Sequence, residues 1–426
     1  MGFHLFTLNC NLGKIYDMRA YKYRIYPNAE QRVLIDKHFG CARHIYNWAL
    51  AEKDKHYKET GKSLSKSELQ KRIVASKKDD KPWLSEVNSQ ALLASLMNLE
   101  TAFGNFFKGR TKFPKFKSKY SGWQSFQCPQ HVTIDFEGNK INLPKLKGIK
   151  IKLHRSFDGQ IKTVTVKRSP SGKYTVSVLV DNNFTAPIPT TVEDNKTLGL
   201  DVGISHFIID SEGNKTNNPN YQKHSLPRLA IEQKKLARKK KGSNNRAKQK
   251  CCVATIHERI ANQRYDFIHQ ETAKLADKSH ATSFAVENLN IKGMVKNRKL
   301  SRAISDCGWG MFITTLRYKC EWNGKNLLTI DRFAPSSKTC SSCGLKQEKM
   351  SLKIREWQCE CGAVHDRDHN AAIMIKQFAL ADALGHSVCV KSSPVAKSIS
   401  VDATAKEVVS VPLGSQEAPT RATSVV

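Results

Sequence analysis

The chain has 426 residues, of which 70 are lysine or arginine and 38 are aspartate or glutamate, giving a formal net charge of +32. This length exceeds what one compact core usually organises, so we expect two or three domains. The charge favours a polyanionic partner, with nucleic acid as the first candidate, over a basic surface that serves only solubility. There is no run of 18 apolar residues, so no membrane span is expected.

The chain contains twelve cysteines, and their distribution separates two classes of protein. Eight are scattered, whereas four lie together between residues 340 and 361. Disulfide scaffolds are typically short and loop-rich, while clustered cysteines in a long basic chain are typical of a cytosolic metal-binding protein. Residues 1–17 lack the basic segment of a secretory signal, so we interpret them as an N-terminal extension upstream of a more natural start at Met18.

The first predicted elements are one strand and two long helices. Residues 18–26 alternate in the manner of a strand that stops at Pro27 and Asn28, and residues 29–56 carry apolar side chains roughly on one helical face. The lysine-rich residues 57–82 are predicted to form a loop with a short helix, and Ser85 is the predicted N-cap of the second long helix. The apolar stripe of that helix, which we interpret as core, consists of Leu92, Leu96, Leu99, Phe103 and Phe106.

Residues 115–190 change to strand patterns. The segments FEGNKINL and VTVKRSPSGKYTVSVLV each predict a hairpin that turns on a glycine, so the region is expected to form a small β-barrel or sheet. Because one strand precedes the helices and these hairpins follow them, the helices are predicted to be an insertion within a β-domain. The proline-rich residues 186–190 mark its end.

From Thr197 onward, strands alternate with long helices. A buried strand, a turn and a second strand come first, followed by a mostly helical region at residues 226–278 that breaks near Gly242. The other predicted elements are two strands and a helix, at residues 281–289, 325–333 and 371–384. This mixture predicts an α/β domain. The tail from residue 386, which has turn formers and no aromatic residue, is predicted to be disordered.

The four clustered cysteines have the spacing of a metal site. Cys340 and Cys343 enclose two residues, and after fifteen more residues Cys359 and Cys361 enclose one. Four thiolates suit tetrahedral zinc, and a site filled by four protein ligands would be structural. The second pair is one residue shorter than usual, and His365 could replace a thiol. Four reduced cysteines in a surface loop are the alternative interpretation.

Three acids stand at the ends of predicted elements. Asp201 ends an apolar strand before a glycine turn, Glu287 directly follows a later strand, and Asp368 lies just before the last helix. Because strand ends gather at one edge of a sheet, these carboxylates could converge and hold Mg²⁺, which prefers oxygen ligands. Two such ions, about 3.5–4 Å apart, can activate water and stabilise the leaving oxygen in phosphodiester cleavage. Asp201 is the best candidate for the bridging ligand.

Each of these acids alone is a weak signal, because an acid before a glycine is often part of an ordinary turn. Asp366 competes with Asp368 for the third position, and Asp368 is preferred because it directly precedes the helix. Asp306, in a different segment, is interpreted as a cap or turn residue.

Two cationic segments predict contacts with nucleic acid. The first is an unbroken run of four cations, Arg238, Lys239, Lys240 and Lys241. On a helix these side chains could lie along a phosphate backbone, and the alternative is a solvated helix face. The second segment, FFKGRTKFPKFKSKY, contains Lys112 and Lys115 and interleaves phenylalanines with lysines. It suits stacking and phosphate contact with single strands or RNA, and it equally fits an amphipathic edge of the core.

These motifs occur together in a known family. In the order that they have in TnpB (OrfB-type) proteins of insertion sequences, the chain carries LGLDVGISHF, FAVENLNIKGM, SDCGWGMFITTLRYK, FAPSSKTCSSCG and CGAVHDRDHNAA. The opening YRIYPNAEQ and the later LMNLETAFGNFF resemble the same family. The resemblance covers about residues 18–380.

The resemblance implies an RNA-guided DNA endonuclease related to type V CRISPR effectors. The implied fold is multidomain α/β, with a wedge β-barrel that contains an inserted helical recognition domain, followed by a RuvC (RNase H-like) α/β nuclease domain with an inserted zinc ribbon. The implied boundaries are 18–28 and 115–190 for the wedge domain, 29–114 for the recognition domain, 191–385 for the nuclease domain, 336–366 for the ribbon and 386–426 for the tail.

The resemblance also implies partners and cofactors. A guide RNA derived from the transposon end would pair with double-stranded target DNA, beside a short motif that the protein reads. The implied cofactors are two catalytic Mg²⁺ ions and one structural Zn²⁺. The implied setting is the prokaryotic cytoplasm, in association with the nucleoid, for a monomer that holds its RNA.

The resemblance assigns roles residue by residue. The RuvC acids are Asp201, Glu287 and Asp368, and the zinc ligands are Cys340, Cys343, Cys359 and Cys361. Ser89 and Gln90, at the start of the second long helix, are candidate readers of the adjacent DNA motif. The shortened second cysteine pair departs from the family pattern, and this departure concerns only the ligand geometry.

Two other functions are weighed beside this one. A non-cleaving, RNA-guided DNA-binding regulator is disfavoured by the intact acids. A transposase-type strand-transfer protein could use the same fold, and it would recognise transposon ends without RNA. The lack of a separate helix-turn-helix or tyrosine-nucleophile motif in the sequence does not favour this second alternative.

Overall fold

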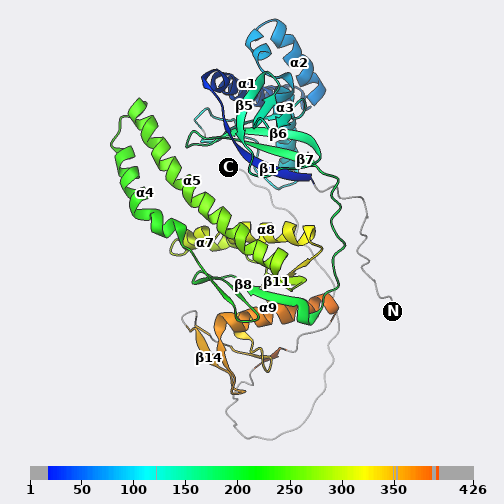
Figure 1. Ribbon diagram of the computed structural model, residues 1–426, viewed down its shortest axis with the longest axis vertical. Coiled ribbons are helices and arrows are strands. Elements are labelled where there is room, and N and C mark those ends of the chain that lie inside the picture. Colours follow the sequence, from blue (N-terminus) through cyan, green and yellow to red (C-terminus); the bar gives the residue numbers. More distant parts are fainter. Residues whose placement is uncertain (1–17, 121, 349, 352–353, 386–389, 393–426) are drawn as a thin grey trace, which may run out of the picture.

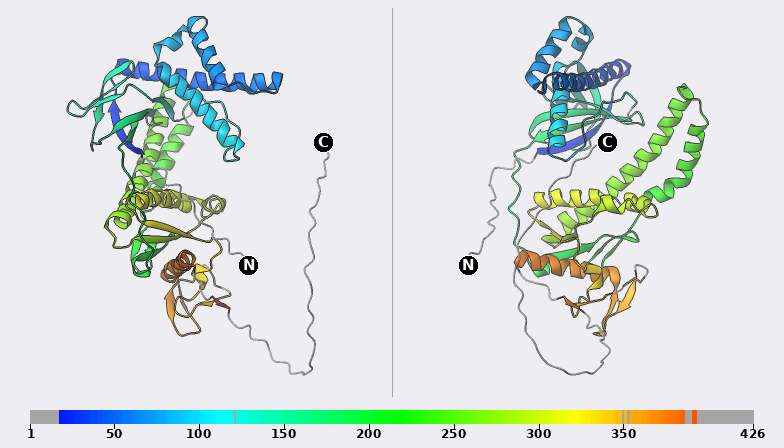
Figure 2. Two further views of the ribbon diagram at one scale, coloured as in Figure 1. Left: turned by 90° about the vertical axis from the view of Figure 1, so that its right-hand side faces the viewer. Right: turned by 180° about the vertical axis from the view of Figure 1, so that it is seen from behind.

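The computed structural model describes residues 18–120, 122–348, 350–351, 354–385 and 390–392 (Figure 1). The predicted extension 1–17 lies outside the described residues, as does nearly all of the predicted tail 386–426. The described chain begins with a β-sheet and its helices, and ends with a second sheet that helices cover on both faces (Figure 2). No helix among the described residues combines the length and hydropathy that a membrane crossing requires.

The first sheet has seven antiparallel strands in the order β2-β6-β7-β1-β5-β4-β3. Its strands are β1 (Met18–Tyr26), β2 (Gln124–Cys128), β3 (Thr133–Asp135), β4 (Lys140–Leu143), β5 (Leu146–Lys152), β6 (Gln160–Arg168) and β7 (Tyr174–Asp181). Strand β1 pairs with β7 on one side and β5 on the other, although about 120 residues separate it from β5. This pairing confirms the predicted helical insertion. Among the described strands no pair joins β2 to β3, so the expected barrel is observed as a sheet without a closing strand pair.

The inserted helices are α1 (Ala29–Thr60), α2 (Lys66–Lys78), the short η1 (Pro82–Glu86) and α3 (Ser89–Phe107). Helix α1 begins at a capping box, in which Asn28 and Gln31 satisfy each other's backbone amides. The prediction of Ser85 as the cap of α3 is wrong. Residue 85 lies inside η1, which Pro82 begins, and the side chain of Asn88 accepts the amide of Gln90 instead.

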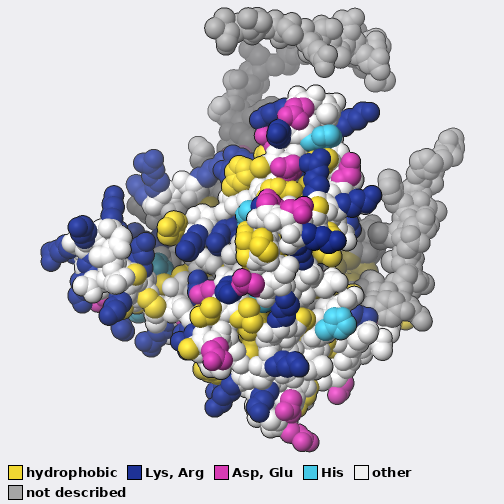
Figure 3. All heavy atoms as spheres, turned by 90° about the horizontal axis from the view of Figure 1, so that it is seen from above, with side chains coloured by type: hydrophobic (Ala, Val, Ile, Leu, Met, Phe, Trp, Pro, Cys, Tyr) yellow, Lys and Arg dark blue, Asp and Glu magenta, His cyan; other side chains and the backbone are white. Residues whose placement is uncertain are grey.

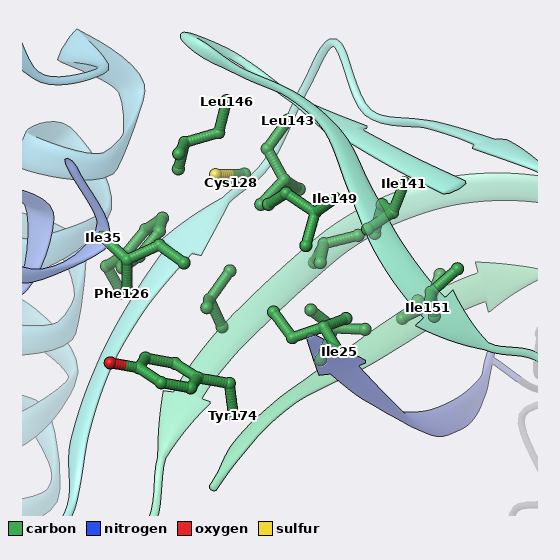
Figure 4. Close-up of a cluster of buried hydrophobic side chains, with 14 of the residues drawn as sticks. Ile25, Ile35, Phe126, Cys128, Ile141, Leu143, Leu146, Ile149, Ile151 and Tyr174 are labelled. Atoms are coloured by element: carbon green, nitrogen blue, oxygen red, sulfur yellow. The ribbon is translucent and has the colours of Figure 1, made fainter. Parts of the chain in front are cut away.

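The insertion packs directly on the first sheet. Ile35 and Phe39 of α1 and Ala91 of α3 share one apolar cluster with Phe126 of β2 and with the central strands (Figure 4). Their burial, at 0–3% exposure, joins the sheet and the helices into one core.

The second sheet has five strands in the order β10-β9-β8-β11-β12. They are β8 (Thr197–Asp201), β9 (His206–Asp210), β10 (Lys215–Asn217), β11 (Ser283–Glu287) and β12 (Asn326–Ile330). Strands β8, β11 and β12 are parallel, whereas β9 and β10 are antiparallel to their neighbours. The first four residues of β8 and of β11 are buried, as expected for parallel strands covered on both faces.

Helices cover both faces of this sheet. They are α4 (Tyr221–Ala237), α5 (Asn244–Ala273), α6 (Ile291–Met294), α7 (Ser301–Cys307), α8 (Trp309–Trp322) and α9 (Arg367–Leu384). Helices α5, α7 and α8 pack on one face, and α9 packs on the other. Helices α4 and α5 form a hairpin that projects away from the sheet (Figure 1). Near its base, Glu258 of α5 pairs with Lys173 and Ser171 of the β6–β7 turn, so the two sheets are joined through this helix.

Candidate active site and metal centre

Two of the predicted acids end neighbouring parallel strands. Asp201 is the last residue of β8 and Glu287 the last of β11, and the strand register places Val286 opposite Leu200. The two carboxylates therefore lie side by side at the carboxyl end of the sheet, where strand-end acids were predicted to converge. Asp368 reaches the same edge from the first turn of α9, which packs across β8.

Electrostatics links the three acids. Burial, followed by the negative charges of Glu287 and Asp368, raises the pKa of the Asp201 carboxyl to about 8, while the charge of Arg367 opposes the shift. A like-charge effect of this kind requires the carboxylates to be close in a poorly solvated place. Such a crowded acid group is arranged to gain from a multivalent cation.

The other two acids contact neighbouring side chains. The hydroxyl of Ser336 donates to Glu287 Oε1 at 2.5 Å. The guanidinium of Arg355 forms an ion pair with Asp368, with 3.1 Å between Nη1 and Oδ2. Among the described residues, only the cysteine cluster brings three or more possible metal ligands within 4.8 Å of one another, so the acids are more widely spaced than the thiols.

The structure separates Asp366 from Asp368. Asp366 is the N-cap of α9, where its Oδ1 accepts the amides of Asp368 at 3.0 Å and His369 at 3.1 Å, and its Oδ2 pairs with Lys215 at 2.6 Å. The predicted reason for preferring Asp368 is therefore wrong, because Asp366 is the residue that precedes the helix. Asp368 stays the candidate for a different reason: because Asp366 accepts the amides of the first turn, the Asp368 carboxylate does not cap the helix.

Close packing places Asp368 relative to Asp201. A Cβ atom added to Gly199 of β8 would lie 2.0 Å from the carbonyl oxygen of Ala372 and 2.8 Å from the amide nitrogen of Lys376, both in α9. Only glycine permits α9 to approach the strand this closely. The helix start is therefore held at a short, sterically defined distance from the end of β8.

Asp306 has a structural role, as predicted. From α7 it accepts the backbone amides of Gln222 at 2.9 Å and Lys223 at 3.4 Å, and so caps the first turn of α4. Arg264 of α5 pairs with the same carboxylate at 2.9 Å. Both carboxylate oxygens of Asp306 accept these hydrogen bonds and the side chain is buried, so neither oxygen is available to bind a cation.

The four cysteines meet in one place. Their sulfur atoms all lie within 4.8 Å of one another, with 3.7 Å between Cys340 and Cys361 and 3.6 Å between Cys343 and Cys359. Tetrahedral Zn–S bonds of about 2.3 Å would set the sulfurs about 3.8 Å apart, so the cluster fits this geometry. His365 does not replace a thiol; its Nε2 lies 3.0 Å from the sulfur of Cys340, at the edge of the cluster.

The shortened pair keeps the turn geometry of the first. In the first turn, the amide of Cys340 bonds the carbonyl of Leu345, and the amide of Gly344 bonds the carbonyl of Cys340. In the second turn, the amide of Cys359 donates to the carbonyl of Ala363, and the amide of Gly362 donates to the carbonyl of Cys359. Each bond spans one residue fewer, so the departure from the usual spacing is absorbed by a tighter turn. Both turns contain a glycine with positive φ, of 76° and 89°.

A buried asparagine joins the cysteine cluster to the acid cluster. The side chain of Asn370 in α9 accepts the amide of Ser341 at 2.9 Å and donates to the carbonyl of Thr339 at 2.7 Å. These two residues flank Cys340, and Asn370 stands two positions after Asp368. The first cysteine turn is therefore attached to the helix that carries the third acid.

The predicted nucleic-acid residues lie on exposed segments. Lys112 and Lys115 are exposed on the loop between α3 and β2. Ser89 is exposed at the start of α3, where its hydroxyl accepts from Lys77 at 2.8 Å, and Gln90 borders a small cavity of about 350 Å³ with Gln127. Phe113 packs against other phenylalanines at ring distances near 5.5 Å, whereas Phe116 is 64% exposed. Phe113 therefore belongs to a packed aromatic edge, as one interpretation expected, whereas the contact of this segment with nucleic acid stays a prediction.

The cationic run is not helical, contrary to the prediction. Residues 238–241 form the turn between α4 and α5. Nη1 of Arg246 donates to the carbonyls of Leu236 at 2.6 Å and Lys239 at 2.9 Å and so orders this turn. Arg238, Lys240 and Lys241 are exposed there and Lys239 is half-buried. The α4–α5 hairpin forms the lobe that projects to the left in Figure 3, where many lysine and arginine side chains are exposed.

The sequence interpretation missed a basic pocket of about 530 Å³ between α5 and the first sheet. Its cations are Arg24, Arg32, Lys119, Arg168 and Lys250. They come from five separate segments, and none stands in a cationic run, so no local pattern could have indicated the pocket. A second cavity of about 640 Å³, between α1, α3 and β2, has Arg43, Lys117 and two exposed aromatic rings, Phe116 and Trp123, on its wall.

The fold and the two clusters define a multidomain α/β protein with two candidate metal sites. Three family models match the chain, described as "Helix-turn-helix domain" over residues 18–62, "Probable transposase" over 173–298 and "Cas12f1-like, TNB domain" over 309–375. A solved structure titled "Cryo-EM structure of the Cas12f1-sgRNA-target DNA complex" has a similar fold. It superposes with a TM-score of 0.52 at 14% identity, over 84% of this chain and 98% of that chain.

Curated relatives match most of the chain. A protein of Streptomyces pristinaespiralis named "Putative RNA-guided DNA endonuclease" is 37% identical over 375 residues, which are 87% of this chain and 90% of the relative. The Escherichia coli (strain K12) protein "Putative RNA-guided DNA endonuclease InsQ" is 30% identical over 80% of this chain and 87% of its own length. The chain therefore belongs to the TnpB (OrfB-type) family that its motifs resemble.

The match over residues 18–62 corrects one step of the sequence analysis. The expected lack of a separate helix-turn-helix motif gave no support to a strand-transfer protein, yet a family model described as a helix-turn-helix domain matches these residues. The described residues of this segment form strand β1, a two-residue link and the single helix α1, without a second helix.

Proposed function

We propose that the protein is an RNA-guided DNA endonuclease whose nuclease centre is built by Asp201, Glu287 and Asp368. The observation that carries the proposal is the meeting of these acids at the carboxyl edge of the second sheet, in a chain of this family. The strand order, with β8 central between the antiparallel β9 and the parallel β11, supports a RuvC (RNase H-like) assignment for this domain. The first sheet with its inserted helices would then be the wedge and recognition domains.

The acids fit two Mg²⁺ ions, because they offer only oxygen donors and repel one another without a cation. When bound, the ions would supply the activation of water and the stabilisation of the leaving oxygen in phosphodiester hydrolysis. The chain's own contribution is positional. Strands β8 and β11 hold Asp201 and Glu287 in register, Ser336 orients Glu287, and Gly199 sets the distance of α9.

The cysteine cluster fits a structural zinc ion. Its four donors are all thiols at tetrahedral spacing, which leaves no position for a substrate. Through Asn370, the ion would stabilise the turn that contacts α9, so its role would be to hold the helix start that carries Asp368.

Loss of one central thiol is expected to remove the zinc. We expect Cys340→Ser to lower the zinc content from about one ion per chain to nearly none, because three thiols bind zinc far less tightly than four. Cys252→Ser, at an exposed cysteine outside the cluster, should keep the full content. Elemental analysis of the purified proteins measures this. Retention of zinc by Cys361→Ser together with its loss in His365→Gln would show that histidine is the fourth ligand instead.

The basic surfaces support an RNA partner and a DNA partner. The projecting turn between α4 and α5 presents positive charge at the start of α5, and the five-cation pocket, which includes Lys250, presents positive charge beside the same helix. The cavity with Phe116 and Trp123 offers aromatic rings beside cations, which suits nucleotide bases. Ser89 and Gln90 are proposed readers of the short DNA motif, since both lie at the start of α3 and Gln90 lines a cavity with Gln127, which also lines the aromatic cavity.

The turn cations are expected to make RNA binding dependent on salt. The double variant Lys240→Ala with Lys241→Ala should bind the guide RNA more weakly and lower the magnitude of the slope of log K against log salt by about 1.5, because each of the two phosphate contacts contributes about 0.7–0.9. The control variant, Lys55→Ala with Lys58→Ala, removes the same amount of positive charge. These two lysines form ion pairs with Glu59 and Asp54 within α1, so they are not expected to contact phosphates. Filter binding at several salt concentrations should show an unchanged slope for this control.

Redirecting the protein with a new guide tests the proposal. RNA that co-purifies with the protein from a cell encoding the element would be sequenced, and its guide segment replaced to match a new DNA target. The proposal expects cut ends at the new target in Mg²⁺. Binding without cut ends would favour a regulator, and joined DNA products formed without RNA would favour strand transfer. A protein that emerges RNA-free, or whose cutting ignores the guide, would contradict the proposal.

A further inference from the structure

One arginine of the cysteine module reaches into the acid cluster. Arg355 directly precedes β14 (Glu356–Gln358), and its Nη1 lies 3.1 Å and 3.4 Å from the two carboxylate oxygens of Asp368. Its Nη2 lies 3.4 Å from the hydroxyl of Ser205, in the turn that follows β8. The guanidinium therefore extends from the helix that carries Asp368 to the turn beside Asp201.

The backbone holds this arginine in place. The carbonyl of Arg355 accepts the amide of Arg367 at 2.7 Å, and the next residue, Glu356, pairs with Asp366 in the β14–β15 hairpin, where β15 is Val364–Asp366. The Arg355 side chain is 60% exposed, while that of Asp368 is 23% exposed. An exposed arginine side chain thus pairs with a half-buried carboxylate. Because hydrogen bonds fix the backbone of Arg355, less conformational freedom is lost when the ion pair forms.

A neighbouring pair provides a comparison. Lys215 of β10 contacts Asp366, which is the cap of the same helix and already accepts two backbone amides. The Lys215–Asp366 pair therefore holds the N-cap residue of α9 in place. The Arg355 pair engages a carboxylate that no helix amide uses, and one that the proposed function needs for a cation.

We propose that Arg355 is a positioning residue that sets the affinity of the acid cluster for divalent cations, through an ion pair with Asp368 that the cation must loosen. This inference rests on the proposed function. A Mg²⁺ ion would take the same oxygens at about 2.0–2.1 Å. Two positive groups on one carboxylate repel each other, so the arginine opposes tight binding. The cysteine module would then tune the nuclease centre as well as support it.

Manganese titration tests this inference. Full-length protein freed of nucleic acid is titrated with Mn²⁺, and the unbound ion is followed by electron paramagnetic resonance. We expect Arg355→Ala to bind Mn²⁺ about five- to tenfold more tightly than the wild type, since one positive charge near a divalent cation is removed and salt screens part of the effect. Arg355→Lys keeps the charge and should remain within about twofold to threefold of the wild type.

Two controls make the result specific. Asp201→Asn defines the Mn²⁺ binding that does not involve the acids, and this background is subtracted. Lys215→Ala removes an equal charge from the same helix start, and it should raise the affinity clearly less than Arg355→Ala does, because Lys215 pairs with Asp366 and its charge acts on Asp368 only without contact. Zinc content and the thermal midpoint report whether Arg355→Ala is folded; Arg355→Gln replaces it if it is not.

Each outcome decides between the two proposals. Wild-type protein without any binding that Asp201→Asn removes would overturn the proposed function together with this inference. Binding that is present, but equal or weaker in Arg355→Ala, would overturn the role of Arg355 alone. An equal gain in Lys215→Ala would show a general charge effect and would likewise overturn it.

Discussion

Replacing Asp201 by asparagine is expected to abolish guided DNA cleavage and, at the same time, to stabilise the protein in buffer without added divalent cation. Asparagine removes the carboxylate that feels the negative charges of both other acids, so the cation cannot be held, and the rate of cutting should fall by at least about a thousandfold. Guide RNA should stay bound, because the change lies away from the basic surfaces. Cleavage of a matched DNA in Mg²⁺ measures the first effect.

The gain in stability follows from the raised pKa of Asp201. In the folded protein this pKa is about 8, whereas in an unfolded chain it is about 3.9. Between these two pH values the folded state holds a proton on Asp201 that the unfolded state has lost. The free energy of unfolding of the wild type is therefore highest below about pH 4, as far as Asp201 is concerned, and it falls as the pH rises to about 8. Asparagine has no charge to bury, so the variant should escape this loss.

Thermal unfolding at pH 5 and pH 8.5 measures the second effect. At pH 8.5 the transition of Asp201→Asn should lie above that of the wild type by about 5 °C or more, and at pH 5 the difference should be smaller. Asp210→Asn, at the end of β9, is the matched control, because Asp210 bonds its own turn through Glu212 and Asn214. Normal cutting by Asp201→Asn would reject the nuclease assignment outright.

The strand-end acids show what the sequence could predict. The runs LGL and FAV contain no polar side chain, which is typical of parallel strands covered on both faces, and an acid follows each run. Two such acids meet when their strands are neighbours, and β8 and β11 are. Choosing between Asp366 and Asp368 required the structure, because both stand near the helix start and only hydrogen bonds reveal which one is the cap.

The missed features have no local signal. Residues 238–241 are good helix formers, so periodicity could not place the turn there, and the break is set by Arg246 and by the Ser243 cap of α5. The five-cation pocket gathers side chains from five segments. Arg355 has no spacing motif, and its partner lies thirteen residues later across a hairpin. Such contacts depend on which distant segments the fold brings together, and a local sequence pattern does not show this.

Replacing Gly199 by alanine is expected to damage the same centre without touching any acid. The added methyl group would meet the backbone oxygen of Ala372 at 2.0 Å, and a backbone atom inside a helix cannot move aside alone. Helix α9 would have to shift away from β8, at a cost of about 3 kcal/mol or more. A displacement of about 1 Å at Asp368 can by itself lower cleavage about a hundredfold.

A second glycine gives the matched control for this substitution. A Cβ added to Gly40, within α1, meets no atom within 4 Å, so Gly40→Ala should stabilise its helix by about 0.5–1 kcal/mol and leave cleavage unchanged. Thermal unfolding and DNA cleavage are measured on both variants, with zinc content as a check that the cysteine module is intact. If Gly199→Ala were as stable and as active as the wild type, α9 could not lie across β8 as observed, and Asp368 would lose its place beside Asp201.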